Sequence, residues 1–299
     1  MDIVTFLIQL LNAVQYGLLL FLVAGGLTLI FGIMGVINLA HGSFYMIGAY
    51  LAWSLSEQLG SLWLAIVAGV ALSVALGLLL EWLFFRHLYR RDHLYQVLLT
   101  YGLILIFEEL RSILWGDDVH GVRVPEVLSG SIPLTDTLSY PVYRLWISAV
   151  CVGLAALLYF VIQRTRLGMM IRAGASNREM VQALGIDIGL LHRVVFALGV
   201  ALAALAGMLA APVSSVFPGM GNQVLIVCFV VVVIGGIGSI KGALLAALLI
   251  GLVDTFGKVV ELEIAGFGVL PELAGMSVYL MMAAVLLWRP EGIFGRRLA

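Results

Sequence analysis

Long apolar runs constrain this chain more than any other feature of its sequence. Nine runs reach, or nearly reach, the roughly 20 apolar residues that a helix needs to cross about 30 Å of hydrocarbon. They cover residues 4–33, 36–55, 62–85, 94–115, 145–162, 194–212, 224–237, 243–260 and 273–288. Because lipid offers no hydrogen-bond partners, a spanning segment must bond its own backbone, which favours helices. We therefore predict an all-α polytopic transmembrane bundle of eight to ten spans, since the first run is over-long and the seventh is short.

Composition leaves little room for structure outside the membrane. Of the 299 residues, 63% are hydrophobic and 11% are charged, whereas an ordinary soluble domain carries about 25% charge. We expect one transmembrane domain over residues 1–299, with a polar loop at 164–193. Cys151 and Cys228 both fall in apolar runs, so we interpret them as small core residues and expect neither a disulfide nor a metal site.

Basic residues are distributed unevenly between the two sides of the predicted membrane. If the runs alternate in direction, twelve of them share one side: Arg86, Arg90, Arg91, Arg164, Arg166, Arg172, Arg178, Arg193, Lys241, Arg289, Arg296 and Arg297. The loops of the other side hold only Arg123 and Arg144. Since short cytoplasmic loops carry the excess of Lys and Arg, the C-terminus is predicted to be cytoplasmic. Nine spans place the N-terminus outside, and a tenth would reverse only the N-terminal side.

Polar residues interrupt the second apolar run and the stretch before it. Residues 32–50, GIMGVINLAHGSFYMIGAY, contain Asn38, His41, Gly42 and Ser43 at membrane depth. Asn and His are costly in hydrocarbon and usually face a protein interior or a water-filled path, while glycines allow helices to approach closely or to break. The stretch is therefore either a helix-packing seam or the lining of a solute path. Asn12 and Gln15 in the first run pose the same choice.

The loop at 164–193 contains a short amphipathic segment. Ser176 has N-cap character and Glu179 follows three residues later, which is the pattern of a capping box. Asn177 follows the predicted cap directly. Apolar residues then recur at i, i+3 and i+4 (Met180, Ala183 and Leu184), and Gly185 suits the C-terminal cap. This helix either lies in the lipid interface or docks on a separate protein.

No catalytic constellation is present in the sequence. We find no nucleophile–base set, no metal-ligand cluster and no Walker A motif, so we expect no cofactor and no enzymatic activity of its own. Two charged pairs lie within apolar runs, Glu108 with Arg111 and Asp254 with Lys258, at helical spacing. They are either local ion pairs or parts of an ion-coupled, stand-alone secondary transporter.

Three stretches carry a family resemblance. Residues 32–50 resemble the signature of the LivH-like permease subunits of branched-chain amino acid ABC importers. Residues 233–251, VIGGIGSIKGALLAALLIG, are similar to the late glycine-rich motif of that family, and residues 164–185, RTRLGMMIRAGASNREMVQALG, to its cytoplasmic loop. Relatives of the family carry branched-chain amino acids, and others carry urea, amides or aromatic acids.

The resemblance implies an ABC importer permease fold and a set of partners. These would be a homologous second permease subunit, two cytoplasmic ATP-binding subunits and a periplasmic solute-binding protein in a bacterial inner membrane, with no nucleic acid. It implies that Asn38, His41, Gly42 and Ser43 line the solute path, and we predict from their polarity alone that Asn12 and Gln15 line it as well. It makes residues Ser176, Asn177, Glu179, Met180, Ala183, Leu184 and Gly185 a coupling helix to the ATPase, and Gly235, Gly236, Gly238 and Gly242 a glycine hinge.

Overall fold

Nine long helices form the protein, one for each apolar run, in the part of the chain that the computed structural model describes. That part comprises residues 3–89, 91–135, 138–259, 263–264, 267–268 and 271–295. The long helices are α1 (Ile3–Met34), α2 (His41–Leu59), α3 (Leu62–Leu80), α5 (His93–Trp115), α6 (Val142–Arg164), α9 (Ile188–Ala210), α10 (Met220–Gly235), α11 (Ile240–Val259) and α12 (Pro271–Trp288). The predicted all-α polytopic class is confirmed, and α1 remains a continuous helix through its Gly25-Gly26 pair.

Short elements connect the long helices. A π-helical turn (Glu81–Phe85) and α4 (Arg86–Leu88) extend α3, and a 3-10 turn (Glu126–Leu128) lies in the loop after α5. Two short helices, α7 (Arg166–Ser176) and α8 (Arg178–Ala183), connect α6 to α9. Two small antiparallel hairpins complete the described elements: β1 (Ser131–Pro133) with β2 (Ser139–Pro141), and β3 (Glu263–Ile264) with β4 (Phe267–Gly268).

Length and apolarity separate the described helices into two groups. Five are long and apolar enough to cross a membrane: α1, the extended α3 at Leu62–Leu88, α6, α9 and α11. Met220–Gly235 and Gly275–Trp288 are equally apolar but shorter. The protein is therefore a multi-pass membrane protein in which the remaining long helices, α2 and α5, carry more polar side chains.

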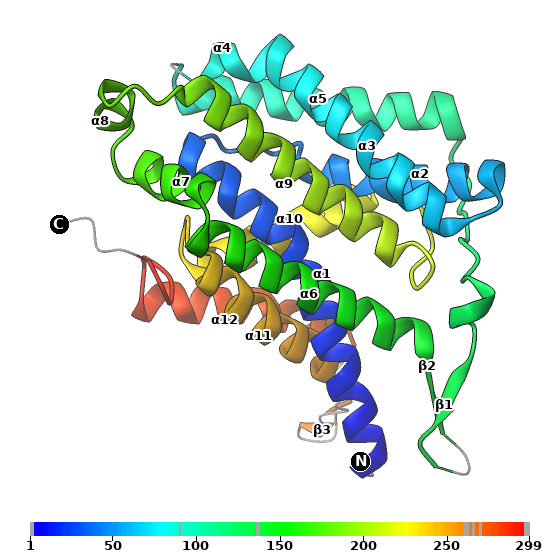
Figure 1. The fold of residues 1–299 in the computed structure, drawn as a ribbon. Helices are drawn as coiled ribbons and strands as arrows, with labels where there is room; N and C mark the ends of the chain where they lie inside the picture. The colour runs from blue at the N-terminus through cyan, green and yellow to red at the C-terminus, as the bar shows by residue number, and fades with distance from the viewer. Residues whose placement is uncertain are drawn as a thin grey trace.

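The helices α1 and α9 form the centre of the bundle. Helix α1 packs against α11, α9, α10 and α6, and α9 packs in addition against α2 and α3 (Figure 1). In its most apolar window, 83% of α1 is buried within the protein, whereas the corresponding share of α6 is 22%. The apolar side chains of α6 therefore point mainly outward, where a lipid bilayer would cover them.

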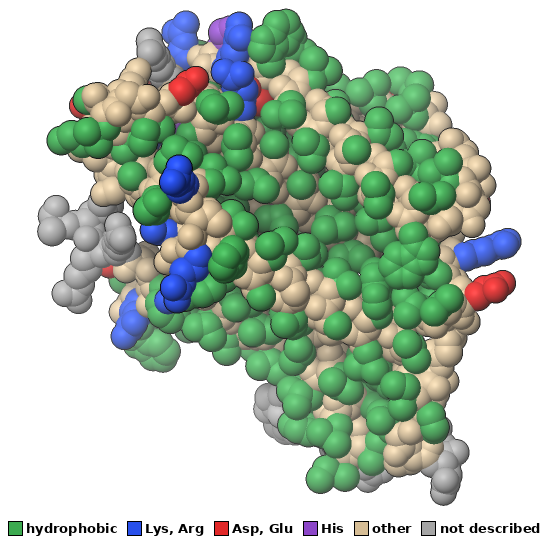
Figure 2. Space-filling model, viewed as in Figure 1, with side chains coloured by type: hydrophobic (Ala, Val, Ile, Leu, Met, Phe, Trp, Pro, Cys, Tyr) green, Lys and Arg blue, Asp and Glu red, His purple; other side chains and the backbone are tan. Residues whose placement is uncertain are grey.

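Two ends of the bundle can be distinguished. The end that carries residues 116–141 is called the loop end, and the opposite end, which carries α7 and α8, is called the α8 end (Figure 1). Basic side chains gather at the α8 end (Figure 2), as the predicted charge asymmetry requires. Of the twelve predicted bases, Arg90, Arg296 and Arg297 lie outside the described residues.

The chain turns back into the bundle between α1 and α2. Helix α1 ends at Met34, and Gly35 follows with a φ of +62°, a conformation that favours glycine. The His41 Nε2 atom then lies 3.0 Å from the carbonyl oxygen of Val23. Since Val23 precedes Met34 by eleven residues, this contact is about 16 Å back along the helix axis. Helix α2 therefore begins inside the bundle and not at its surface.

A second glycine-rich break joins α10 to α11. Helix α10 ends at Gly235, and Gly236 and Gly238 follow with φ values of +93° and +78°. The hydroxyl of Ser239 accepts a hydrogen bond from the backbone N–H of Gly242 (3.1 Å), which starts α11. The predicted hinge residues thus form one tight turn; their hinge role stays a prediction. The two breaks touch, because a side chain at Gly32 would clash with the Gly238 backbone.

The loop after α5 is fastened to the segment that follows α9. His120 and Val216 exchange two backbone hydrogen bonds of 2.8 Å each. The His120 ring also stacks on Trp53 of α2, with ring centroids 3.6 Å apart. At the start of the same loop, Arg111 binds the Asp117 carboxylate at 2.8 Å, which holds the pKa of that carboxyl below its usual range.

Candidate functional site

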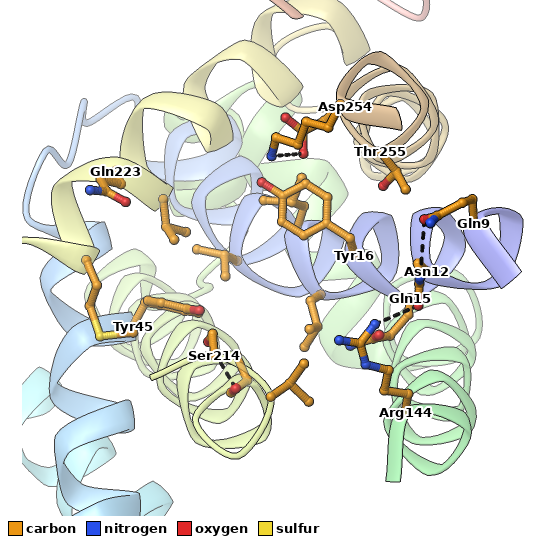
Figure 3. Close-up of a pocket in the computed structure, with 18 of the residues that line it drawn as sticks. Gln9, Asn12, Gln15, Tyr16, Tyr45, Arg144, Ser214, Gln223, Asp254 and Thr255 are labelled. Carbon is orange, nitrogen blue, oxygen red and sulfur yellow. Dashed lines mark hydrogen bonds and ion pairs between the residues drawn. The ribbon is translucent and has the colours of Figure 1, made fainter. Parts of the chain in front are cut away.

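The structure contains a cavity of about 540 Å³ near the loop end of the bundle (Figure 3). Its walls come from the first half of α1, Tyr45 of α2, the start of α6, residues 210–217, the start of α10 and the last turn of α11. We call it the loop-end cavity. Segments from six long helices (α1, α2, α6, α9, α10 and α11) therefore converge on one space, which is the usual setting of a ligand site in a helix bundle.

One wall of the cavity is a hydrogen-bonded polar cluster. Arg144 donates from Nη1 to the Asn12 Oδ1 atom at 2.6 Å, and the Tyr140 hydroxyl donates to the same oxygen at 3.2 Å. Asn12 donates in turn to Gln9 at 3.3 Å. Burial raises the pKa of Tyr140 above its usual range, so its hydroxyl remains a neutral donor. This cluster connects α1 to the start of α6.

The facing wall carries an ion pair. Lys258 Nζ lies 2.6 Å from Asp254 Oδ2, one turn apart on α11, and the lysine side chain is 60% exposed. The Tyr16 hydroxyl points toward this pair (Figure 3). A local ion pair is thus what the structure shows for Asp254 and Lys258. The same holds for Glu108 and Arg111, which lie 3.5 Å apart.

Apolar side chains complete the lining. They are Leu19, Leu20, Val23, Val213, Phe217, Met220 and Val224. Polar groups at separate points of an otherwise apolar wall can orient a small solute that has both polar and apolar parts. The described residues of the chain hold no cluster of His, Cys, Asp and Glu that could bind a metal ion.

The sequence-predicted path residues are divided between two places. Asn12 and Gln15 line the loop-end cavity. Asn38, His41, Gly42 and Ser43 do not; all four are buried, and neither polar atom of the Asn38 side chain has a hydrogen-bond partner within the described chain. Their role in a path stays a prediction.

Close backbone packing encloses this second group. A Cβ atom at Gly42 would overlap the Gly221 carbonyl oxygen of α10, and one at Gly48 would overlap the Ala204 carbonyl oxygen of α9. We call residues 36–43 the sealed segment, because none of them lines the loop-end cavity or the second cavity described next.

A second cavity, of about 820 Å³, lies at the α8 end. It is lined by Phe31 and Gly32 near the end of α1, by Gly35, by the turn between α10 and α11, and by Arg172, Arg178 and Lys241 among others. Helix α1 lines the loop-end cavity up to Val23 and this cavity from Phe31, a separation of eight residues or about 12 Å. The His41 ring contacts the backbone of Val23, where the loop-end cavity ends, and Gly35 lines the second cavity. The sealed segment therefore lies between the two cavities.

Several lining residues were missed from the sequence, above all Arg144, Tyr45, Ser214 and Gln223. Arg144 did carry a signal, because it is one of two bases on the side that the charge asymmetry leaves nearly free of them. Tyr45 lies within the glycine-rich stretch, but the sequence does not distinguish a tyrosine that lines a cavity from an aromatic core residue. Ser214 follows the end of one apolar run and Gln223 precedes the start of the next, and neither belongs to a motif.

The predicted coupling helix forms, but its N-cap differs from the prediction. Ser176 is the last residue of α7, and Asn177 caps α8 by accepting a hydrogen bond from the Met180 N–H at 2.9 Å. The Ser176 capping box was therefore wrong. Gly185 has a φ of +84°, and the bonds from Gly185 N to Gln182 O and from Ile186 N to Val181 O form a Schellman motif. The predicted glycine C-cap is confirmed.

The apolar face of α8 points away from the protein. Met180 is 58% exposed and Leu184 73% exposed, and Ala183 between them is also exposed. Val181 is the residue that α8 buries. Glu179 is exposed as well. An exposed apolar face on a helix outside the bundle is a feature that a partner or a lipid surface can cover.

Comparison with known proteins gives one consistent result. The family described as "Branched-chain amino acid transport system / permease component" matches residues 9–286. The chain belongs to this family. It is 31% identical to the high-affinity branched-chain amino acid transport system permease protein BraD of Pseudomonas aeruginosa, over 99% of this chain and 97% of the relative. The resemblance found in the three sequence stretches is thereby confirmed.

More distant relatives agree. The high-affinity branched-chain amino acid transport system permease protein LivH of Escherichia coli is 28% identical, over 97% of this chain and 96% of the relative. The probable branched-chain amino acid transport permease protein LivH of Methanocaldococcus jannaschii is also 28% identical, over 95% and 91%. No solved structure gives a significant match. The chain therefore spans most of the length of each of these relatives.

Proposed function

We propose that this protein is the membrane-spanning subunit of an ABC importer that moves branched-chain or related amino acids across the inner membrane. The observation that carries the proposal is the full-length family match, from residue 9 to residue 286. The geometry supports it: one cavity lies at each end of the bundle, and the sealed segment lies between them. Such an arrangement suits alternating access, in which a closed centre opens to one side at a time.

The energy for transport comes from partner subunits in this proposal. Two cytoplasmic ATP-binding subunits would dock at the α8 end, and a homologous second permease subunit would complete the pathway. A periplasmic solute-binding protein would deliver the solute at the loop end. The exposed apolar face of α8 supports the first of these contacts, because more than half of the surface of Met180 and of Leu184 is open to a partner.

Reconstitution tests the proposal directly. The chain, its neighbouring permease subunit and the matching ATP-binding subunits are co-expressed, purified in mild detergent and placed in liposomes with the binding protein inside or outside. We expect uptake of L-leucine that requires ATP and the binding protein. Uptake that instead follows an ion gradient, from a chain that copurifies with no ATPase, would contradict the proposal and favour a secondary transporter.

A charge on α8 tests the coupling contact. We expect Met180→Asp to assemble in the membrane but to uncouple ATP hydrolysis from uptake, because the charge falls on the exposed apolar face. Gln182→Asp is the matched control, since it adds the same charge to an exposed position on the other side of the same helix. Wild-type uptake by the Met180→Asp complex would remove α8 from the coupling contact.

Labelling tests the orientation. Ser129 is exposed at the loop end and Glu179 at the α8 end. In intact cells, a cysteine at Ser129 is expected to react with a membrane-impermeant maleimide, and one at Glu179 only after permeabilisation. The reverse pattern would place the C-terminus outside.

A further inference from the structure

The guanidinium of Arg144 has N–H donors that no group of the described chain occupies. A guanidinium has five N–H donors, and the partners of the Arg144 guanidinium in the structure are the Asn12 side-chain oxygen and the Tyr140 hydroxyl, which leaves donors free. No carboxylate of the described residues lies within 4 Å of it, whereas Arg111 and Lys258 each have such a partner. Arg144 is also half-buried. A cation that is partly removed from water without an anion is unfavourable, so this side chain is kept in a state that an anionic ligand would stabilise.

The surrounding cluster holds the guanidinium at the cavity. Asn12 accepts from both Arg144 and Tyr140, which fixes the amide oxygen between α1 and α6. In Figure 3 the guanidinium lies beside Asn12 and Gln15 on the cavity wall. A planar guanidinium held in one orientation can bind both oxygens of a carboxylate. Lysine would offer only a point charge at the same place.

The other polar groups of the cavity do not compete for an anion. Asp254 is negative, and the Lys258 charge is already paired with it at 2.6 Å. Tyr16, Tyr45, Ser214 and Gln223 are neutral. The remaining lining is apolar and includes Phe217 and Val213. The cavity therefore offers one open cationic group and an apolar wall, which fits an organic carboxylate with an aliphatic or aromatic body.

We propose that Arg144 is the carboxylate-binding residue of the loop-end cavity, and that the solute of this permease is a carboxylate and not a neutral molecule such as urea or an amide. This inference rests on the proposed importer function and names the chemical class of its solute. It also assigns a binding role to a residue that the sequence motifs leave aside. Asn12 acts as a positioning residue, since it reaches the solute through Arg144.

Protection from labelling tests the inference without the binding protein, which would impose its own selectivity. A cysteine replaces Ser214, which lines the cavity, in the assembled transporter, and its rate of reaction with a maleimide is measured in liposomes. Four compounds of similar shape are added separately: L-leucine, isovalerate, isoamylamine and isovaleramide. We expect L-leucine and isovalerate, which carry a carboxylate, to slow the reaction several-fold. Isoamylamine and isovaleramide should leave it unchanged.

Variants of Arg144 complete the test. We expect Arg144→Gln to raise the leucine concentration for half-protection at least about tenfold, because losing a charge-assisted pair costs more than the ~1.4 kcal/mol of a tenfold change. Arg144→Lys should fall between wild type and Arg144→Gln. Arg123→Gln, which removes the other loop-end base from an exposed position, should leave protection unchanged.

The outcomes separate this inference from the proposed function. Equal protection by isovaleramide, or undiminished protection in Arg144→Gln, would overturn the carboxylate site. Absence of all protection in a complex that still imports leucine would overturn it too, and would leave the importer function standing. Failure of the wild-type complex to import any amino acid would instead contradict the proposed function. If Arg144→Gln does not assemble, the comparison of the four compounds on the wild-type residue remains decisive.

Discussion

The loop-end cavity and the sealed segment are both polar regions at membrane depth, yet they differ in what faces the polar groups. In the cavity, Asn12 meets the side chain of Arg144 beside open space. In the sealed segment, His41 meets the backbone of Val23, and Gly42 lies against the backbone of Gly221. Eleven residues with polar side chains line the cavity and three lie in the sealed segment, and the cavity is the region that has space for a solute.

The difference shows how glycine decides the environment of its polar neighbours. Where two helices meet at glycines, their backbones approach so closely that no space remains for water or a solute. Helices separated by longer side chains, such as α1 and α6 at Asn12 and Arg144, leave room between them. Variants in the two regions should therefore differ in their effects: those in the closely packed region should mainly change stability, and those in the cavity should mainly change transport.

The largest effect is expected at Gly48. We expect Gly48→Val to destabilise the folded protein by about 3 kcal/mol, the upper end of overpacking costs, because the new side chain would overlap the Ala204 backbone. The yield of monodisperse protein and the melting temperature in detergent measure it. Gly102→Val is the matched control, since Gly102 lies in α5 with open space around it. A Gly48→Val protein as stable as this control would show that the close packing of α2 on α9, next to the sealed segment, does not restrict side chains.

A smaller effect is expected at His41. Replacing it with leucine removes the hydrogen bond to Val23 and should lower stability by about 1 kcal/mol, the usual net contribution of such a bond. Thermal melting measures that change, and uptake per folded complex is measured beside it. Reduced or altered uptake would support the path role that the sequence predicts. A melting temperature equal to that of the wild type would mean that the hydrogen bond to Val23 does not contribute to stability.

The smallest effect on stability is expected at the cavity. Gln223 is exposed to the loop-end cavity, so Gln223→Ala should change the free energy of unfolding by no more than about 0.5 kcal/mol. Its effect should appear in the solute concentration needed for half-maximal uptake. Gln58→Ala, at an exposed site outside the cavity, provides the baseline. If Gln223→Ala lowered stability as much as His41→Leu, the distinction between an open cavity and a closely packed segment would be wrong.

The helices could be predicted from the sequence, because membrane thickness fixes the length of each apolar run. The site could be predicted only in part. Asn12 and Gln15 could be predicted, because they are polar residues within an apolar run. Arg144 could not be joined to them, since 132 residues separate it from Asn12 and only the tertiary fold brings the two together. The cap of α8 was misplaced by one residue because Ser176 and Asn177 are both good N-cap residues.

The pairing of His120 with Val216 has a mechanical consequence. Two backbone hydrogen bonds couple the loop after α5 to the segment after α9, and the His120 ring stacked on Trp53 couples the same loop to α2. That segment supplies Val213, Ser214 and Phe217 to the rim of the cavity. We therefore expect a displacement of the loop to shift the rim of the cavity through the His120–Val216 pairing.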